Sequence, residues 1–136
     1  MTKHTRMNWT ALLSSERLGD SSYQAQKNRS IFVQDHDRIV FSAPFRRLAN
    51  KTQVQPLYEN DHVHHRLIHS VEVSSVGRSL AMRIGNWLAD KAEITQADVS
   101  DLANVVQAAC VAHDIGNPPF GHSGEAAMGS WFADLF

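Results

Sequence analysis

Residues 113–125 carry the densest group of chemically active side chains in the sequence. The segment follows an apolar stretch with helical spacing and enters a turn rich in glycine and proline, so these groups lie where a helix ends. Imidazole and carboxylate groups that converge at the end of an element can bind a metal ion or transfer protons. An enzyme is therefore our first hypothesis. The side chains concerned are those of His113, Asp114, Asn117, His122 and Glu125.

His69, His113 and Asp114 form a candidate metal-binding set. If the two predicted helices that carry the histidines pack antiparallel, the imidazoles can meet in the core and Asp114 adds a carboxylate oxygen. Such a set leaves positions for water and a substrate oxygen, which suits a metal that activates water or neutralises phosphate charge. A lone histidine is more often an ordinary core or surface residue, but the adjacent Asp114 and the following turn favour the metal site.

His122 and Glu125 are three residues apart at the start of a new helical pattern. On one helical face, Glu125 can accept a proton from a ring nitrogen of His122 and fix its tautomer, and such a histidine exchanges protons near neutral pH. Alternatively, Glu125 interacts only with the helix dipole and His122 lies in a solvated loop. The spacing supports both interpretations equally.

Arg66 precedes His69 by three residues and so shares its helical face. A guanidinium beside a metal suits a phosphate oxygen, because it donates two hydrogen bonds and keeps its charge. The other basic side chains fit solvated faces or structural ion pairs better. The cluster of His62, His64 and His65 has no carboxylate on the same helical face, so we interpret it as a surface feature.

The elements that must position these groups are predicted to be helices. Residues 62–88 form one helical pattern, and a second begins where Thr95 and Asp98 resemble a capping box and ends at Gly116. Each helix is predicted to bury the apolar stripe on which its histidine lies. These stripes are His69, Val73, Val76 and Leu80 in the first helix, and Leu102, Val106, Ala109 and His113 in the second.

The earlier part of the chain is less regular. Residues up to about 28 are polar and irregular around a short apolar patch, and residues 42–49 predict a short helix capped by its first serine. Only residues 31–33 and 53–55 could form short extended pieces. An all-α domain is therefore predicted.

Composition sets broad limits on the function. The 136 residues suffice for one ordinary globular domain, with 43% hydrophobic and 20% charged residues. A net charge of −1 gives no general attraction to nucleic acid or membranes. The single cysteine, Cys110, excludes an internal disulfide and lies in an apolar run, which predicts a buried thiol in a reducing compartment. Without any membrane-length apolar window, the expected location is cytoplasmic.

Five spaced motifs resemble the HD-domain superfamily of metal-dependent phosphohydrolases, and within it the deoxyguanosine triphosphate triphosphohydrolases (dGTPases) and dGTPase-like proteins. The resemblance extends over residues 37–136. It implies an all-α HD-domain helical bundle, with residues 37–136 as its N-terminal part and residues 1–36 as an N-terminal arm. The motifs are residues 66–73 around His69, residues 112–125, and the upstream segments 45–48, 51–54 and 59–61.

The resemblance implies metal-dependent hydrolysis of a deoxynucleoside triphosphate, dGTP being favoured, to the deoxynucleoside and tripolyphosphate. The implied metal is Mn²⁺ or Mg²⁺, with iron or nickel as alternatives. Homo-oligomers and a single-stranded DNA effector are also implied. By the family pattern the residues divide into metal ligands (His69, His113, Asp114), a catalytic pair (His122, Glu125) and substrate-binding residues (Arg66, Gln53 for the sugar 3′-hydroxyl, Arg46 and Lys51 for the polyphosphate).

The family's fourth metal ligand is an aspartate on a later helix, beyond position 136. The uncapped apolar segment at residues 131–136 also indicates that further sequence follows, so we expect this sequence to be the N-terminal portion of a longer protein. Without the fourth ligand, we expect it to be inactive by itself. Two alternatives stay open. One is an HD-type nucleotide phosphomonoesterase or phosphodiesterase, and the other is a non-catalytic module that binds nucleotides or single-stranded nucleic acid.

Overall fold

The computed structural model describes residues 8–17, 19, 26, 28–51, 65–118 and 120–135. This part of the chain forms α-helices, one 3₁₀ helix and turns, with an isolated bridge between Gln26 and Arg29 and no β-strand, which confirms the all-α prediction. None of these helices is long and apolar enough to cross a membrane. The elements are α1 (Trp9–Leu12), α2 (Ile31–Val40), α3 (Ala43–Arg46), η1 (Arg47–Asn50), α4 (Arg66–Asp90), α5 (Gln96–Ala112) and α6 (Gly121–Ala133).

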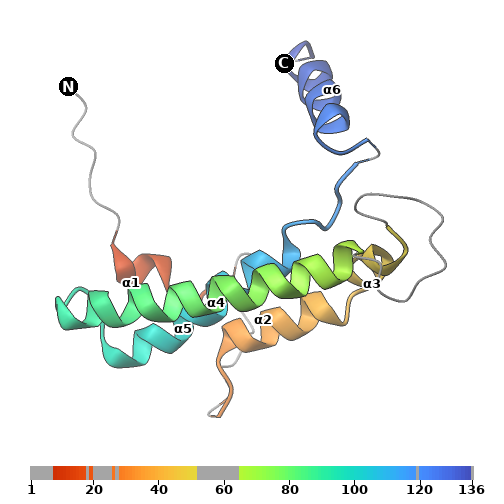
Figure 1. Cartoon of the computed structure of the whole chain (residues 1–136). Helices are drawn as coiled ribbons and strands as arrows, with labels where there is room; N and C mark the ends of the chain where they lie inside the picture. Colours follow the sequence, from red (N-terminus) through yellow and green to blue (C-terminus); the bar gives the residue numbers. More distant parts are fainter. Residues whose placement is uncertain are drawn as a thin grey trace, which may run out of the picture.

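Helices α4 and α5 form an antiparallel hairpin, and α2 packs against α5 (Figure 1). The backbones of α4 and α5 approach each other closely because α4 has glycines on the side that faces α5. A Cβ atom at Gly77 would lie 2.5 Å from the Sγ atom of Cys110, and one at Gly85 would lie 2.9 Å from Cγ1 of Val99. The two long helices therefore hold each other in a fixed register.

Capping side chains set where the helices begin. The predicted capping box is confirmed at α5, where the Asp98 backbone N–H donates to Thr95 Oγ1 and the Thr95 backbone N–H donates to the Asp98 carboxylate. Hydrogen bonds from the side chain and then the backbone of Thr95 lower the pKa of Asp98 below its ordinary 3.8. Ser42 caps α3 as predicted, with Pro44 in its first turn.

The prediction of an extended piece at residues 31–33 is wrong, because these residues form the first turn of α2. Ser30 caps this helix through the Phe32 backbone N–H and also donates from its hydroxyl to Asp101 on α5 at 2.7 Å. The cap and the packing against α5 outweigh the β-propensity of a short apolar run. Residues 53–55 lie outside the described residues. The suggested boundary after residue 36 falls within α2 and stays a prediction.

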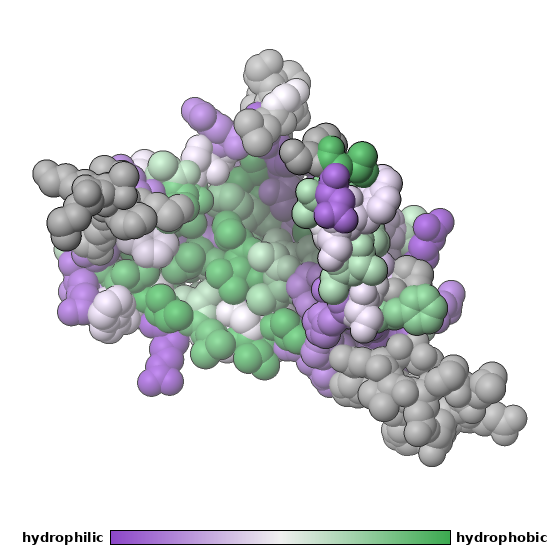
Figure 2. Space-filling view, turned by 90° about the horizontal axis from the view of Figure 1, so that it is seen from above, coloured by the Kyte–Doolittle hydropathy of each residue, from purple (hydrophilic) through white to green (hydrophobic). Residues whose placement is uncertain are grey.

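The predicted buried stripe of α4 is wrong at two of its four positions, since His69 and Val73 are half-buried. Val76 and Leu80 are 61% and 55% exposed, whereas the face against α5 consists mainly of small residues. Small side chains allow the close approach of the backbones, so the apolar stripe lies beside the contact instead of within it. Figure 2 shows apolar side chains gathered across the face seen from above. The buried residues of α4 are Ser70, Ser74, Ala81, Gly85 and Leu88.

The predicted buried stripe of α5 is wrong as well: Ala109 and His113 are exposed, and Leu102 and Val106 are only half-buried. Cys110, predicted to be buried, is half-buried. Two small apolar clusters at opposite ends of the hairpin form the core. One contains Phe45, Leu48 and Val111, and the other contains Leu88, Ile94 and Val99.

Helix α6 stands clear of the hairpin (Figure 1). It has no buried residue, and Met128, Trp131 and Phe132 are each at least half exposed. The turn before it contains left-handed backbone at Gly116, with φ of 82°, and at Phe120, with φ of 69°. This turn directs the chain away from the end of α5.

Candidate metal centre

His69, His113 and Asp114 lie together at one end of the hairpin. One nitrogen or oxygen donor from each residue lies within 4.8 Å of the donors of the other two. His69 is in the first turn of α4, and His113 ends α5, so the antiparallel packing brings the rings together edge to face at 5.4 Å. The predicted meeting of the two imidazoles is thus observed, although at a partly exposed position, with 37% of the His113 side chain accessible.

The His113 ring is oriented by the backbone of its own helix. Its Nδ1 atom lies 2.7 Å from the carbonyl oxygen of Cys110. Because a carbonyl oxygen only accepts, Nδ1 carries the proton and Nε2 keeps its lone pair. Nε2 lies 3.7 Å from Oδ2 of Asp114, so the free nitrogen faces the cluster. A metal-binding histidine is commonly held in this way.

Asp114 is buried and held through one of its two oxygens. Its Oδ1 accepts hydrogen bonds from Nη1 of Arg66 at 3.0 Å and from Nδ2 of Asn117 at 3.2 Å. A carboxylate with an exposed side-chain fraction of only 10% needs such hydrogen-bond donors to replace water. Oδ2, on the side of His113, is left for a ligand. Two imidazoles and one carboxylate in this arrangement fit a divalent metal with open coordination positions.

A pocket of about 380 Å³ adjoins Asp114, and both Lys51 and Arg66 line it. Lys51 donates from Nζ to the carbonyl oxygen of Asn117 at 3.1 Å. Two basic side chains beside a candidate metal-binding cluster favour an anionic ligand such as phosphate. Of the other predicted substrate-binding residues, Arg46 is exposed on α3 and does not line this pocket, and Gln53 lies outside the described residues.

His122 and Glu125 form the predicted pair in the first turns of α6. Nδ1 of His122 lies 3.2 Å from Oε2 of Glu125. The His122 side chain is fully exposed and that of Glu125 is half exposed. The carboxylate accepts from Nδ1, which leaves Nε2 free to exchange a proton. The structure brings these two residues together on α6, and Figure 1 shows α6 standing apart from the hairpin that carries the metal-ligand candidates.

A family model described as the HD domain matches residues 66–134, which is more than half of the chain. The chain belongs to the HD-domain family. The match begins at Arg66 and includes the metal-binding cluster and all of α6. The helical hairpin with its paired histidines is therefore part of an HD domain.

Relatives of this HD-domain chain carry dGTPase names. A "Deoxyguanosinetriphosphate triphosphohydrolase-like protein" of Pseudomonas aeruginosa is 56% identical over 128 residues, which are 93% of this chain and 28% of the relative. A protein of the same name from Synechocystis is 49% identical over 93% of the chain. The "Deoxyguanosinetriphosphate triphosphohydrolase" of Yersinia pestis is 48% identical over 75% of it. The chain spans about 28% of the length of the first of these relatives.

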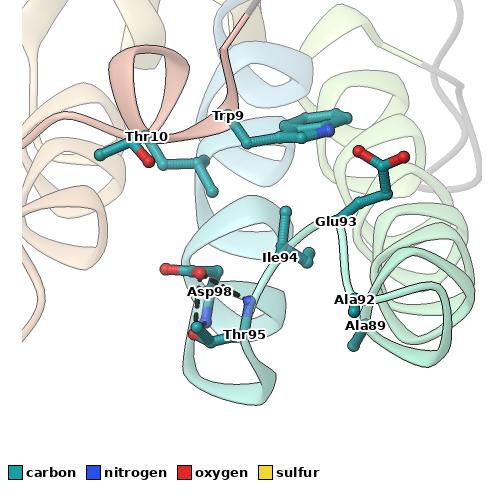
Figure 3. Close-up of a pocket in the computed structure, with 9 residues that line it drawn as sticks. Trp9, Thr10, Ala89, Ala92, Glu93, Ile94, Thr95 and Asp98 are labelled. Atoms are coloured by element: carbon teal, nitrogen blue, oxygen red, sulfur yellow. Dashed lines mark hydrogen bonds between the residues drawn. The ribbon is translucent and has the colours of Figure 1, made fainter.

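A second pocket, of about 590 Å³, lies at the opposite end of the hairpin. Figure 3 shows Trp9 of α1 above the loop that carries Glu93 and Ile94, and the capping hydrogen bonds between Thr95 and Asp98. These side chains serve the junction of α1 with the hairpin and the start of α5. The chemistry predicted from the HD motifs thus belongs to the other end of the hairpin.

The sequence did not reveal two contacts of the HD site. The carbonyl group of Cys110 orients His113, and no sequence pattern marks a backbone acceptor. Asn117 was singled out as chemically active without a role, and in the structure it supports Asp114. Its position three residues after Asp114 in a turn is the signal that could have found it, because such spacing brings the two side chains together.

Proposed function

We propose that this chain forms the metal- and phosphate-binding part of an enzyme that hydrolyses a deoxynucleoside triphosphate, with dGTP favoured, to the deoxynucleoside and tripolyphosphate. The observation that carries the proposal is that Arg66 belongs to both the candidate metal site and the basic pocket. Its Nη1 donates to the metal-ligand candidate Asp114, and its side chain also lines the basic pocket with Lys51. The metal-binding cluster and the basic pocket are therefore adjacent, with Arg66 between them. The names of the relatives support dGTP as the substrate.

Hydrolysis at the α-phosphorus needs an in-line water, cations on the non-bridging oxygens and a proton for the leaving 5′ oxygen. His69, His113 and Asp114 would hold Mn²⁺ or Mg²⁺, which when bound neutralises phosphate charge and activates water. Arg66 and Lys51 bind the remaining phosphate oxygens. His122 exchanges the proton at Nε2, while Glu125 holds Nδ1. A dNTP that bridges the pocket and α6 would bring this pair to the reacting group.

Metal binding is tested on the chain itself with Co²⁺, whose visible spectrum reports nitrogen and oxygen ligands. We expect one bound ion, and loss of binding in His69→Ala and His113→Ala. His36→Ala, on α2, is the matched control and should bind like the unaltered chain. Equal binding by all variants contradicts the metal site.

Turnover is tested in a chimera in which this chain replaces the matching segment of the Pseudomonas aeruginosa relative. Release of tripolyphosphate from dGTP supports the proposal. Orthophosphate release or opening of a cyclic nucleotide supports the phosphomonoesterase or phosphodiesterase alternative, and nucleotide binding without hydrolysis supports a non-catalytic module. We expect His122→Ala to abolish turnover and leave the metal content nearly unchanged. Loss of metal as well would contradict the role given to His122.

The 136-residue chain by itself should bind metal but hydrolyse dGTP at most weakly. Three protein ligands leave the coordination open, and α6, which carries the catalytic pair, stands apart from the hairpin. Turnover equal to that of the chimera contradicts this expectation. Activation by single-stranded DNA and formation of homo-oligomers are further proposals, which activity with added oligonucleotide and light scattering test in the chimera.

A further inference from the structure

Helix α4 has an exposed apolar side next to its contact with α5. Its residues recur at helical spacing, and each of them is more than half exposed. His69 continues the same spacing toward the start of α4, so the metal-binding cluster lies at one end of this side. Figure 2 shows apolar side chains gathered on the face of the molecule above which α6 stands in Figure 1. The apolar side of α4 consists of Val76, Leu80, Ile84 and Trp87.

Helix α6 has an exposed apolar side of its own. Met128, Trp131 and Phe132 lie on one face of the helix, and Leu135, just after it, continues their spacing. Each of these side chains is at least half exposed. Exposed groups of large apolar side chains mark surfaces that bind a partner, because their removal from water is favourable. The described part of the chain therefore contains two apolar sides that are able to cover each other.

The two apolar sides lie at matching distances from the basic pocket. Arg66, the first residue of α4, and Gly121, the first residue of α6, both line this pocket. With a rise of about 1.5 Å per residue, Val76 lies about 15 Å along α4 and Phe132 about 16 Å along α6. If α6 lies along α4 from their common end, the apolar side of one helix meets that of the other.

The turn before α6 contains a residue at which its direction can change. Phe120 has left-handed backbone with φ of 69°, which is unfavourable for a residue with a side chain unless the surrounding packing holds it there. The Phe120 side chain is 91% exposed, so little packing holds this conformation. A change of backbone conformation at Phe120 therefore redirects α6 without loss of a buried contact.

We propose that α6 is a lid that folds back onto the apolar side of α4, with Met128, Trp131 and Phe132 packed against Val76 and Leu80. The closed lid runs antiparallel to α5, as consecutive helices joined by a short connection commonly do. The connection also favours α6 over a second copy of the chain as the occupant of this surface. A short tether holds a segment at an effective concentration of about 1 mM, far above that of a second copy in a micromolar solution.

Closure of the lid has a consequence for the candidate site. His122 and Glu125 lie in the first turns of α6, and closure lays these turns along the hairpin at the end that carries the metal-binding cluster. A group that transfers a proton must come within hydrogen-bond reach of the reacting atoms. The lid would then control turnover by bringing the pair to the cluster. This consequence rests on the proposed function, whereas the closure itself does not.

A disulfide tests the closure in the chain itself. Cys110→Ser removes the native thiol and keeps its size, and Val76→Cys with Phe132→Cys adds one thiol to each apolar side. Under mild oxidation this pair should link within one molecule at least about tenfold faster than the control pair. The matched control is Val76→Cys with Ser130→Cys, because Ser130 is exposed on the opposite side of α6 at nearly the same height. Nonreducing electrophoresis and peptide mass spectrometry identify the linked residues.

Hydrogen exchange tests the closure without added cysteines. A helix as short as α6 is only marginally stable by itself, so its amides are protected only when it packs. Leu80→Asp puts a charge on the apolar side of α4 and should make the α6 amides exchange at least about tenfold faster. Ser75→Asp, at an exposed position of α4 outside the apolar side, should leave their exchange unchanged. Circular dichroism checks that each variant folds.

Several results would overturn the inference. Disulfide-linked dimers assign the apolar side of α4 to a second copy, and equal rates for the two cysteine pairs or unprotected α6 amides mean that the lid does not close. The Val76→Cys and Phe132→Cys pair is also placed in the chimera. Failure to link there means that the remaining part of the longer protein covers the apolar side, which overturns the inference as well. If the pair links but the unaltered chimera releases no tripolyphosphate, the lid closes and the proposed function alone fails.

Discussion

Gly77→Ala tests how the packing of the hairpin supports the metal-binding cluster. The added Cβ atom would lie 2.5 Å from Sγ of Cys110 and 3.4 Å from its Cβ. Relief of this overlap requires the Cys110 side chain to rotate or the residue to move away from α4, and we expect the residue to move because the two helices are closely packed. The Cys110 carbonyl group accepts the hydrogen bond that orients His113, so the displacement reaches a metal-ligand candidate. The expected result is a loss of both stability and metal affinity from one methyl group.

Two opposing effects set the size of the stability change. Overpacking a well-fitted contact costs about 1–3 kcal/mol. Alanine in place of glycine within a helix returns about 1 kcal/mol. The Gly77→Ala chain should therefore be less stable by about 0–2 kcal/mol. Cys110→Ala removes the Sγ atom and leaves a Cβ-to-Cβ distance of 3.4 Å, which needs only a small adjustment. The free energy of unfolding of the double variant should be about 1–3 kcal/mol higher than the sum of the two single changes predicts.

Urea unfolding of the four chains in the double-mutant cycle measures the coupling, and Co²⁺ titration measures metal affinity. We expect Gly77→Ala to bind Co²⁺ up to about tenfold more weakly, and the double variant to recover most of this affinity. Additive stabilities would refute the steric argument. A destabilised Gly77→Ala chain with unchanged Co²⁺ affinity would refute the link from the hairpin packing to His113.

Three further changes test other parts of the structure. Arg66→Ala should weaken tripolyphosphate binding to the metal-loaded chain at least about tenfold by calorimetry, whereas Arg83→Ala, on the exposed face of α4, should not. Gly116→Ala should destabilise the chain by about 1–2 kcal/mol, because φ is 82° there with no atom near an added Cβ. Gly129→Ala, in a helix and equally open, should instead stabilise α6. Asp98 has a lowered pKa in the folded chain, so its contribution is complete above the ordinary 3.8 and is lost as the pH falls through the folded value. The stability difference from Asp98→Asn, measured in urea, should therefore shrink below about pH 4, and a constant difference would contradict the capping assignment.

The local features of the fold follow from short stretches of sequence. The capping box at Thr95 and Asp98 needs two side chains three residues apart, and both belong to one helical turn. The pairing of His122 with Glu125 is equally local. The meeting of His69 and His113 required one added assumption, that the two helices pack antiparallel. Each of these features depends on a few contacts, and nearly all of those contacts are between residues whose spacing can be read from the sequence.

The buried faces were not predictable in this way. The apolar period of α4 identifies Val76 and Leu80 as one face, but the contact with α5 is decided by Gly77 and Gly85. Close backbone approach depends on what the partner helix presents, here Cys110 and Val99. A hydrophobic pattern within one helix carries no such information. The role of the Cys110 carbonyl group could not be predicted for the same reason, since every residue has one.

The shared position of Arg66 links two binding equilibria. Its guanidinium contacts Asp114 and also lines the pocket with Lys51, so an anion in the pocket and a cation on the cluster both act on one side chain. Thermodynamic reciprocity then imposes an equality: the factor by which tripolyphosphate changes metal affinity must equal the factor by which the metal changes tripolyphosphate affinity. The concentrations of the metal and of the anion would therefore jointly set how much of this site is filled, and neither concentration alone determines it.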